Sequence, residues 1–309
     1  MLLSVQTGGI VSEQMEPEQG YRLIKECGFD GVDWNLDHAW NYAEIYKRIW
    51  RDCVLEQPFS NVKEAYAEEI EIIRKNGLIV CQAHAPFPSY VADFPELDQH
   101  VGLIYENCIR LCQEVGCKYL VVHGISRRPD MTDMMREEML EMNLALYERM
   151  IPVLKETEVV VCLENLFRSK NGRIYPGVCS DPYECIYLID TLNEKAGKKC
   201  FGLCFDTGHL NLLDGDMEGY LKLLGKRVCA LHIHDNYGKL DDHKMPYNGT
   251  ICWESFCRAL REIGYEGTLN FETFHQYTPD RMEADMVPCF LRALAEIGKK
   301  FRDRIQGAV

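Results

Sequence analysis

Several short apolar runs of this sequence end in residues that can bind a metal ion or move a proton. The clearest is Phe201–Phe205, which is followed at once by Asp206 and then by His209. An apolar run without polar alternation is typical of a buried parallel strand. Proteins with parallel strands bind their ligands at the carboxyl ends of those strands. This stretch therefore predicts a carboxylate and an imidazole at a functional edge of a sheet.

Other apolar runs end in the same residue types. These ends are His84 in AHAPF, His123 in VVHG, Glu164 in CLENL, His232 and His234 in LHIHDN, and Glu272 in NFET. Histidine, aspartate and glutamate are ligands of Mn²⁺, Co²⁺ or Zn²⁺. Any one of them could instead be a hydrogen-bonded structural group or a helix cap. Because six successive strands end in this way, the set predicts a divalent metal site.

Two further features leave alternatives open. His232 and His234 are two residues apart, so both can face the same side of a strand. One of them is enough to bind a metal, and the other can then hydrogen-bond a substrate. Asp241, Asp242 and His243 form a second cluster of acids and imidazole, which is either part of the site or a solvated polar loop.

The apolar runs alternate with helical patterns along the whole chain. The predicted strands are Leu2–Gln6, Gly31–Asn35, Leu78–Ala83, Tyr119–His123, Val159–Glu164, Phe201–Phe205, Val228–His234 and Thr268–Glu272. The longest predicted helix between them covers Thr132–Leu154. Eight strands and about eight helices predict an α/β protein, one (β/α)8 TIM barrel spanning residues 1–309 as a single domain. A doubly wound sheet would be unusually wide, and no GxGxxG follows the first strand.

Residues 37–61 interrupt this alternation. The segment has a helix-like pattern and is rich in aromatic residues, including Trp40, Tyr42, Tyr46 and Trp50. We expect an inserted helical segment. It is either a lid or a subunit contact beside the site, or an extra helix packed on the barrel, because such side chains favour both sugar faces and protein interfaces.

Composition narrows the class of protein. The net charge of −14 repels phosphate backbones, so a nucleic-acid partner is not expected. The fifteen cysteines are scattered, mostly within apolar runs, and none forms a CxxC pair. This usage is typical of reduced thiols in a cytoplasmic protein. No stretch reaches the roughly 20 apolar residues of a membrane helix, so no membrane association is expected.

In their order, the motifs resemble a known superfamily. LEN (163–165), DTGH (206–209), HxHDN (232–236), DDH (241–243) and FET (271–273) together resemble the xylose isomerase-like barrels. Within them the chain is similar to the sugar phosphate isomerase/epimerase group, which is related to the AP endonuclease family 2 of endonuclease IV. The resemblance covers most of the chain. It implies an enzyme acting on a small sugar or sugar phosphate, and dimers or tetramers are common in that family.

The resemblance to ketose 3-epimerases also implies roles for individual residues. One divalent ion would be held by Glu164, Asp206, Glu272 and one histidine of the HIH pair. The H-x-x-D-N pattern favours His232 as that ligand, and a looser match favours His234. His209 would contact a substrate oxygen. The two glutamates would also move a proton next to a carbonyl, through an enediolate that the metal stabilises.

The chain departs from the epimerases at two places. They have a further glutamate six residues after the glutamate of strand five, where this chain has Lys170. They also have an arginine shortly after the histidine of strand seven, where this chain has Tyr237, Gly238 and Lys239. Arg168 and Lys239 are therefore alternative contacts for an acidic group of the substrate.

Other activities remain open from the sequence. Endonuclease IV, a trinuclear zinc phosphodiesterase acting on abasic DNA, has ligands of the same types at nine corresponding positions. These positions are His84, His123, Glu164, Asp206, His209, His232, Asp241, His243 and Glu272. The acidic charge argues against DNA repair. Dehydration of sugar acids, cleavage of C-glycosides and sugar binding without catalysis are further alternatives on the same scaffold.

Overall fold

The computed structural model describes residues 1–126 and 133–307, apart from the side chains of residues 133–135. The chain forms two compact units, each built from separate stretches of sequence. The first contains residues 1–34, 71–81 and 204–309, and the second contains residues 35–70 and 82–203. Strands β3 (Ile79–His84) and β8 (Phe201–Asp206) each begin in one unit and end in the other, and the last residue of β2 (Gly31–Asn35) also lies in the second unit.

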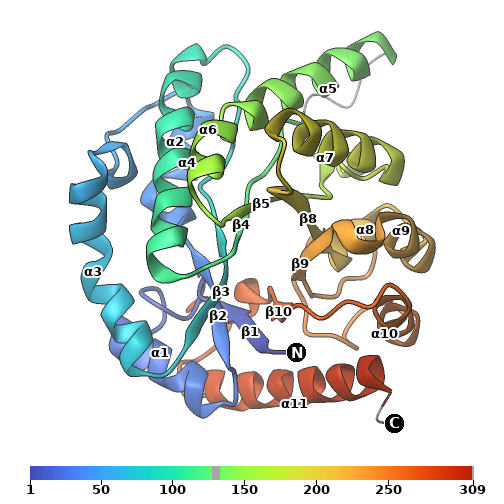
Figure 1. Ribbon diagram of the computed structural model, residues 1–309. Coiled ribbons are helices and arrows are strands. Elements are labelled where there is room, and N and C mark those ends of the chain that lie inside the picture. The colour runs from blue at the N-terminus through green and yellow to red at the C-terminus, as the bar shows by residue number, and fades with distance from the viewer. Residues whose placement is uncertain (127–132, 308–309) are drawn as a thin grey trace. The chain divides into compact units, whose positions relative to one another are not determined.

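Strands and helices alternate along the chain as the sequence predicts (Figure 1). The strands of the first unit are β1 (Leu3–Gln6), β2 (Gly31–Asn35), β9 (Val228–His232) and β10 (Leu269–Phe271). β1 pairs in parallel with β10 on one side and with β2 on the other. All four residues of β1 are buried, including the polar Ser4 and Gln6.

The strands of the second unit also pair in parallel. β4 (Tyr119–Val121) pairs in parallel with β3 on one side and with β5 (Val160–Glu164) on the other. Eight such strands alternate with helices, so the predicted (β/α)8 barrel class is confirmed.

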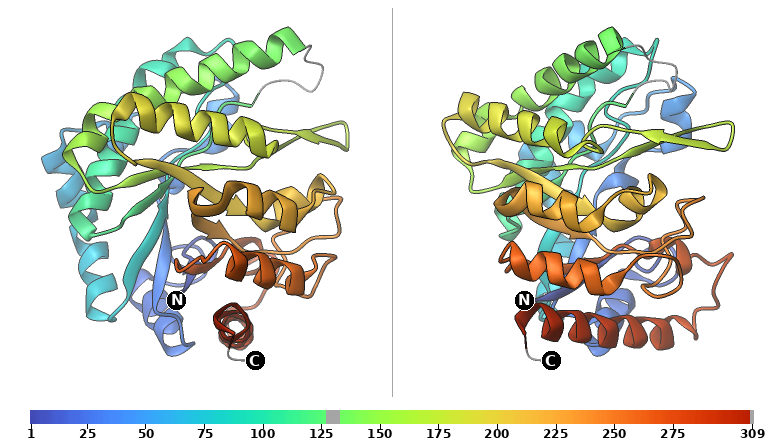
Figure 2. Two further views of the ribbon diagram at one scale, coloured as in Figure 1. Left: turned by 45° about the vertical axis from the view of Figure 1, so that its right-hand side comes forward. Right: turned by 90° about the vertical axis from the view of Figure 1, so that its right-hand side faces the viewer.

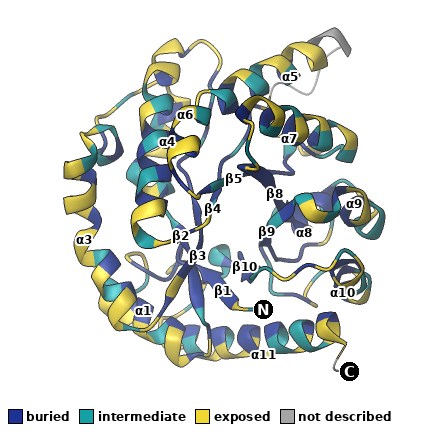
Figure 3. Ribbon diagram, viewed as in Figure 1, coloured by how far each residue is buried: buried dark blue, intermediate teal, exposed yellow. Residues whose placement is uncertain are grey.

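The helices of the first unit follow its strands. They are α1 (Pro17–Glu26), α8 (Thr207–Leu212), α9 (Met217–Leu224), α10 (Trp253–Glu262) and α11 (Val287–Gln306), with 3₁₀ turns η3 (Gly225–Arg227) and η4 (Phe274–Gln276). Figure 3 shows that the helices present one buried and one exposed face. On α11 the buried face includes Phe301, whose ring stacks on Trp253 of α10 at 5.1 Å. This packing buries apolar area that stabilises the unit.

The second unit contains the remaining helices. They are α2 (Tyr42–Tyr46), α3 (Phe59–Lys75, whose last turn belongs to the first unit), α4 (Pro95–Val115), α5 (Asp133–Glu148), α6 (Ile151–Glu156) and α7 (Pro182–Ala196), with 3₁₀ turns η1 (Asp37–Ala39) and η2 (Val54–Glu56). Residues 37–61 thus form several short elements instead of one helix. The predicted helix Thr132–Leu154 is two helices, because Pro152 lies in the first turn of α6 and cannot continue α5. Thr132 itself lies outside the described residues.

One element of the second unit was not predicted. β6 (Phe167–Lys170) and β7 (Arg173–Pro176) form an antiparallel hairpin directly after β5, and Figure 2 shows it as a narrow two-stranded ribbon. Asn171 and Gly172 join the strands with positive φ angles of 53° and 74°. An Asn-Gly pair is the preferred sequence for such a tight turn. The signal was present in the sequence.

Candidate metal-binding site

Four strands end in ligand-type residues at the positions that the sequence predicts. His84 ends β3, Glu164 ends β5, Asp206 ends β8 and His232 ends β9. All four side chains are at most 3% exposed. His123 lies two residues beyond β4 and Glu272 one residue beyond β10, so these two follow the strands instead of ending them. Buried ionisable groups are rare unless they are paired or bind an ion.

Three of these residues meet in the first unit, and we call them the Asp206 group: Asp206, His232 and Glu272. Nδ1 of His232 lies 3.8 Å from Oδ2 of Asp206 and 3.4 Å from Oε2 of Glu272. The other carboxylate oxygen of Glu272, Oε1, accepts a 2.7 Å hydrogen bond from the amide of Gln6. One imidazole nitrogen and two carboxylate oxygens therefore converge in a buried place.

The second ring nitrogen of His232 has a different neighbour. Nε2 lies 3.3 Å from Oδ2 of Asp33, a fully buried carboxylate within β2, which is an ion-pair distance without hydrogen-bond geometry. Metal-binding histidines commonly point their other nitrogen at a carboxylate, which fixes the ring and raises its basicity. The arrangement favours Nδ1 of His232 as a ligand nitrogen. Neither Asp33 nor Gln6 was recognised in the sequence.

Asp206 has two separate tasks in this geometry. Its Oδ1 accepts a 2.6 Å hydrogen bond from the backbone N–H of His209 and so caps helix α8. Its Oδ2 lies 3.0 Å from Nε2 of His234, 3.7 Å from Nδ1 of His209 and, as noted, near His232. Oδ1 of Asp206 therefore caps α8, while Oδ2 faces the imidazole rings of three histidines.

A second set in the same unit consists of His209, His234, Asp241 and His243, which we call the His243 group. Each offers a nitrogen or oxygen atom, and these four atoms lie within 4.8 Å of one another. Asp241 Oδ2 is 3.0 Å from Nε2 of His243 and 3.4 Å from Nε2 of His209. Of the alternatives for residues 241–243, the structure therefore shows a packed cluster for Asp241 and His243.

Two neighbours determine the protonation of His243, namely the backbone carbonyl of Glu272 and the carboxylate of Asp241. Nδ1 of His243 lies 2.8 Å from the backbone carbonyl of Glu272, which can only accept, so this nitrogen carries a proton. Burial would lower the pKa of His243, but the Asp241 carboxylate outweighs burial and raises this pKa to about 9. Burial likewise opposes ionisation of Asp241, and His243 and His209 nevertheless hold its pKa well below the usual value.

The third set lies in the second unit and consists of His84, His123 and Glu164, which we call the Glu164 group. Oε2 of Glu164 is 3.0 Å from Nε2 of His123 and 3.8 Å from Nε2 of His84. Nδ1 of His84 faces the backbone carbonyl of Ala85 at 2.9 Å, so the proton of the neutral ring lies on that side. The lone pair of Nε2 is then directed towards the other two residues.

The residues of these groups fit a divalent cation. Mixed imidazole and carboxylate donors suit Mn²⁺, Co²⁺ or Zn²⁺. In the His243 group, Nδ1 of His234 and Oδ1 of Asp241 are buried without a hydrogen-bond partner in the described structure. Such atoms are costly to bury unless something else, for example an ion, satisfies them.

Arg168 and Lys239 do not belong to these groups. Arg168 lies in the hairpin strand β6, where its Nε donates to the carbonyl of Pro176 at 2.6 Å. Lys239 is exposed in the loop between β9 and α10, and no hydrogen bond or ion pair links it to another described residue. A role for either in substrate binding stays a prediction.

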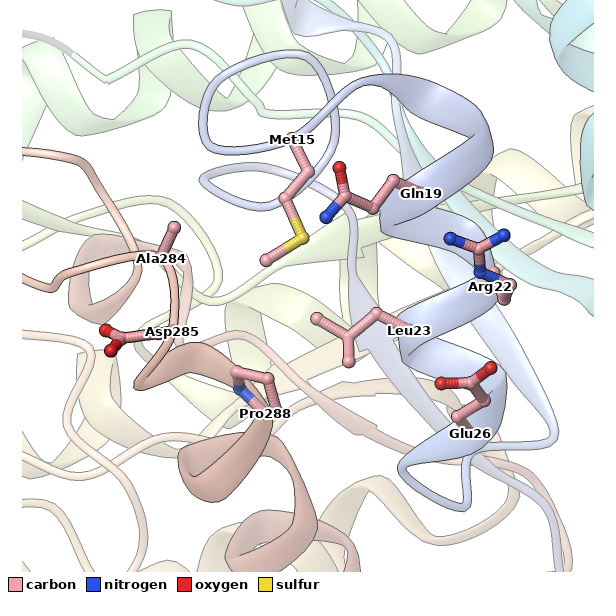
Figure 4. Close-up of a pocket in the computed structure, with 8 residues that line it drawn as sticks. All are labelled: Met15, Gln19, Arg22, Leu23, Glu26, Ala284, Asp285 and Pro288. Carbon is pink, nitrogen blue, oxygen red and sulfur yellow. The ribbon is translucent and has the colours of Figure 1, made fainter.

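A cavity of about 370 Å³ in the first unit is separate from the three groups. Figure 4 shows its lining: Met15, Gln19, Arg22, Leu23, Glu26, Ala284, Asp285 and Pro288. Met15 and Leu23 point into the space between α1 and the start of α11. The lining shares no residue with the candidate ligands, so we assign it no part in the site. In the chain that the structure describes, no helix is both long and apolar enough to cross a membrane.

The chain matches a family model described as a xylose isomerase-like TIM barrel over residues 21–294. Among individual proteins, the uncharacterised y4fM of Sinorhizobium fredii is 27% identical over 81% of this chain and 79% of its own length. Inosose isomerase of Bacillus velezensis is 24% identical over 55% of this chain and 58% of its own. D-psicose 3-epimerase of Enterocloster bolteae is 28% identical over 39% of this chain and 35% of its own length.

Solved structures resemble almost the whole chain. D-psicose 3-epimerase in the presence of D-fructose gives a TM-score of 0.67 at 13% identity, covering 99% of this chain and all of the other. The IolI protein with a binding zinc atom gives a TM-score of 0.68 at 17% identity, covering 99% of this chain and 98% of the other. At sequence identities of 13% and 17%, the likeness shows only that the folds are similar. Sugar epimerases and isomerases are thus found among both the relatives and the structural neighbours.

Proposed function

Because the chain belongs to the xylose isomerase-like TIM-barrel family, we propose that it is a divalent-metal-dependent isomerase or epimerase of a small sugar or sugar phosphate. The observation that supports this most directly is the Asp206 group, with Asp33 behind His232. The named relatives support the carbohydrate class, since they include an inosose isomerase and a D-psicose 3-epimerase.

We propose that Asp206, His232 and Glu272 hold the ion together with Glu164, which ends β5. All four side chains are at most 5% exposed, so ligands of this set would be largely shielded from water. When bound, the ion would polarise a substrate carbonyl and stabilise negative charge on the neighbouring oxygens. Mn²⁺, Co²⁺ and Zn²⁺ all suit these donors.

Proton transfer is assigned to the two glutamates. A hydrogen next to a carbonyl is weakly acidic, and a carboxylate within hydrogen-bond reach can remove it. Return of a proton by a second carboxylate on the other face would invert that carbon or move the carbonyl. For Glu272, the bond from Gln6 holds one oxygen and so sets the direction of the other. For Glu164, Oε2 lies 3.0 Å from Nε2 of His123, at ion-pair distance.

The first test replaces each glutamate by glutamine. In a panel of ketoses and their phosphates, we expect turnover to fall by at least about 100-fold in Glu164→Gln and in Glu272→Gln, as is typical for loss of a general acid or base. Deuterium from heavy water should appear in the product of the wild-type reaction at the carbon that exchanges its hydrogen. Glu283→Gln, at an exposed position outside the three groups, is the matched control.

Metal content is measured for every variant, because glutamine is also a weaker ligand. Undiminished turnover in both variants would contradict the proposed proton-transfer pair. A loss of turnover that is accompanied by an equal loss of metal would assign the glutamates to binding alone.

One observation favours a second candidate, a phosphodiester hydrolase with three zinc ions. Besides the Asp206 group, the His243 group and the Glu164 group each gather ligand atoms. The resemblance to endonuclease IV places its nine ligands on residues of these three groups. Against it stands the net charge of −14, which disfavours DNA.

Elemental analysis separates the two candidates, using protein purified without added metal or chelator. About one ion per chain would favour the isomerase. About three zinc ions would show that the outer histidines are ligands, and cleavage of DNA at abasic sites would then be assayed before any sugar.

A further inference from the structure

A second cavity of the first unit lies on helices α10 and α11 and has a volume of about 380 Å³. Its lining residues are Glu254, Cys257, Arg258, Arg261 and Arg304. The first four are spaced i, i+3, i+4 and i+7, which places them on one face of α10. None belongs to the three ligand groups. The cavity is therefore a separate candidate site.

Three guanidinium groups around one cavity are notable in a chain with a net charge of −14. Arg258 has a carboxylate partner, since its Nη2 lies 2.6 Å from Glu218. Arg261 and Arg304 have no carboxylate partner among the described residues. Two of the three positive charges at this cavity are thus not neutralised by an ion pair.

Each of the two unneutralised arginines makes one hydrogen bond to the protein, and that of Arg304 is the shorter. Nη1 of Arg304 donates to the hydroxyl of Tyr247 at 3.0 Å, and Nη1 of Arg261 reaches the backbone carbonyl of Arg304 at 3.5 Å. Each contact uses one N–H, and a guanidinium has five. Most of the donors of both groups remain available to a ligand. The hydrogen bond of Arg304 to Tyr247 reduces the side-chain freedom that this arginine would lose on binding.

Tyr247 is itself in an unusual conformation. Its φ angle is 74°, in the left-handed region that bulky residues rarely adopt. The conformation is maintained by the backbone N–H of Tyr247, which donates to Oδ2 of the buried Asp235 at 3.1 Å. The same oxygen accepts a 3.1 Å hydrogen bond from the indole of Trp253. Backbone strain of this kind clusters at functional sites, although other loop residues of this chain also have positive φ angles.

We propose that this cavity binds a small anion of the phosphate class between Arg261 and Arg304, with Arg258 contributing the third positive charge. A guanidinium matches phosphate oxygens with two parallel N–H donors, which an ammonium cannot do. Glu254 reduces the charge of the cavity, and the acidic chain repels long polyanions, so the occupant is a small phosphate-bearing molecule and not nucleic acid.

Calorimetric titration of the full-length, metal-loaded protein with inorganic phosphate and with pyrophosphate tests the proposal. The double variant Arg261→Gln/Arg304→Gln should bind at least about tenfold more weakly at this site, because charge-assisted hydrogen bonds are lost. Arg292→Gln is the matched control, since this exposed arginine also belongs to α11 but does not line the cavity. We expect the control to bind as the wild type does.

Phosphate can also bind at a metal ion, so a second measurement locates the anion. Crystals of the wild-type protein soaked in tungstate should show anomalous density between Arg261 and Arg304. Density at the ligand groups alone would overturn the proposal, as would equal phosphate binding by the double variant and the wild type. If the double variant does not fold, Arg261→Gln alone removes one charge at the cost of a single long contact.

Discussion

At the level of single residues, the carboxylate of Asp33 separates the roles of the two neighbouring histidines. His232 has Asp33 at Nε2 and turns Nδ1 towards Asp206 and Glu272, whereas His234 stacks on His243 at 4.0 Å. The sequence left the choice between them open. The geometry supports His232 in the Asp206 group and His234 in the His243 group.

The role of Asp33 can be tested by Asp33→Asn. The change leaves the side chain's shape but removes the negative charge that faces Nε2 of His232. We expect the affinity for the ion of the Asp206 group to fall by about 10- to 100-fold, as for other carboxylates behind a ligand histidine. Competition with a fluorescent chelator measures this affinity. Asp285→Asn, at an exposed position, should have no effect, and equal affinities in both variants would show that Asp33 is only structural.

A second residue-level prediction concerns pH. Because the pKa of His243 is raised to about 9, a proton occupies this ring in the metal-free protein at neutral pH. An entering ion must displace it, so the affinity of the His243 group for Zn²⁺ should increase as the pH rises towards about 9. In the metal-free protein, the charge pair with Asp241 stabilises the fold fully below the ordinary pKa of 6.5 and is lost as the pH rises through about 9.

Titration of the metal-free protein followed by NMR of the histidine rings checks this expectation. In Asp241→Asn the midpoint of His243 should fall, since the carboxylate that raises its pKa is gone. Asp285→Asn, at an exposed position outside this group, is the control and should leave the midpoint of His243 unchanged. An unchanged His243 midpoint in Asp241→Asn would assign the raised pKa to another group.

The positions of the candidate ligands at strand ends were predictable, because His84, Glu164, Asp206 and His232 each end an apolar run. Asp33 was not, because it lies inside a strand and its partner His232 is about 200 residues away, which periodicity cannot reveal. Gln6 was missed for another reason. An amide is not a typical metal ligand, and its role lies in the hydrogen bond to Glu272.

At the level of secondary structure, helix α8 starts immediately at the end of β8 and brings Gly208 against the ring of His234. A Cβ atom at position 208 would lie 2.0 Å from Cε1 of His234. Neither α8 nor this contact was predicted, since six residues are too few to show helical periodicity. The glycine permits the close approach that places His209 and His234 in one group.

Gly208→Ala should therefore destabilise the protein by about 1–3 kcal/mol, through overpacking, despite the better helix propensity of alanine. Urea unfolding of the metal-free protein measures this difference. The same substitution in a His234→Ala background removes the colliding ring, so we expect it to cost little there. An equal cost in both backgrounds would place the strain somewhere other than at His234.

At the level of the whole molecule, stability should depend on bound metal. Glu164, Asp206 and Glu272 are buried carboxylates in a chain that is already acidic, so an ion that binds only the folded state stabilises it. With the ion at 1,000 times its dissociation constant, about 4 kcal/mol would be lost on chelation. Urea unfolding with and without chelator measures the difference. Glu272→Gln should respond less, and an equal response would exclude Glu272 as a ligand.

The division of the chain also determines when each unit can form during synthesis. β1 leaves the ribosome well before its partner β10, since Gln6 and its acceptor Glu272 are 266 residues apart. The nascent chain must therefore keep the open edge of β1 from pairing with other chains until β10 has been made. A chain that stops before β10 lacks Glu272 and also leaves its first strand without this neighbour, so premature termination would yield an aggregation-prone product instead of a shorter enzyme.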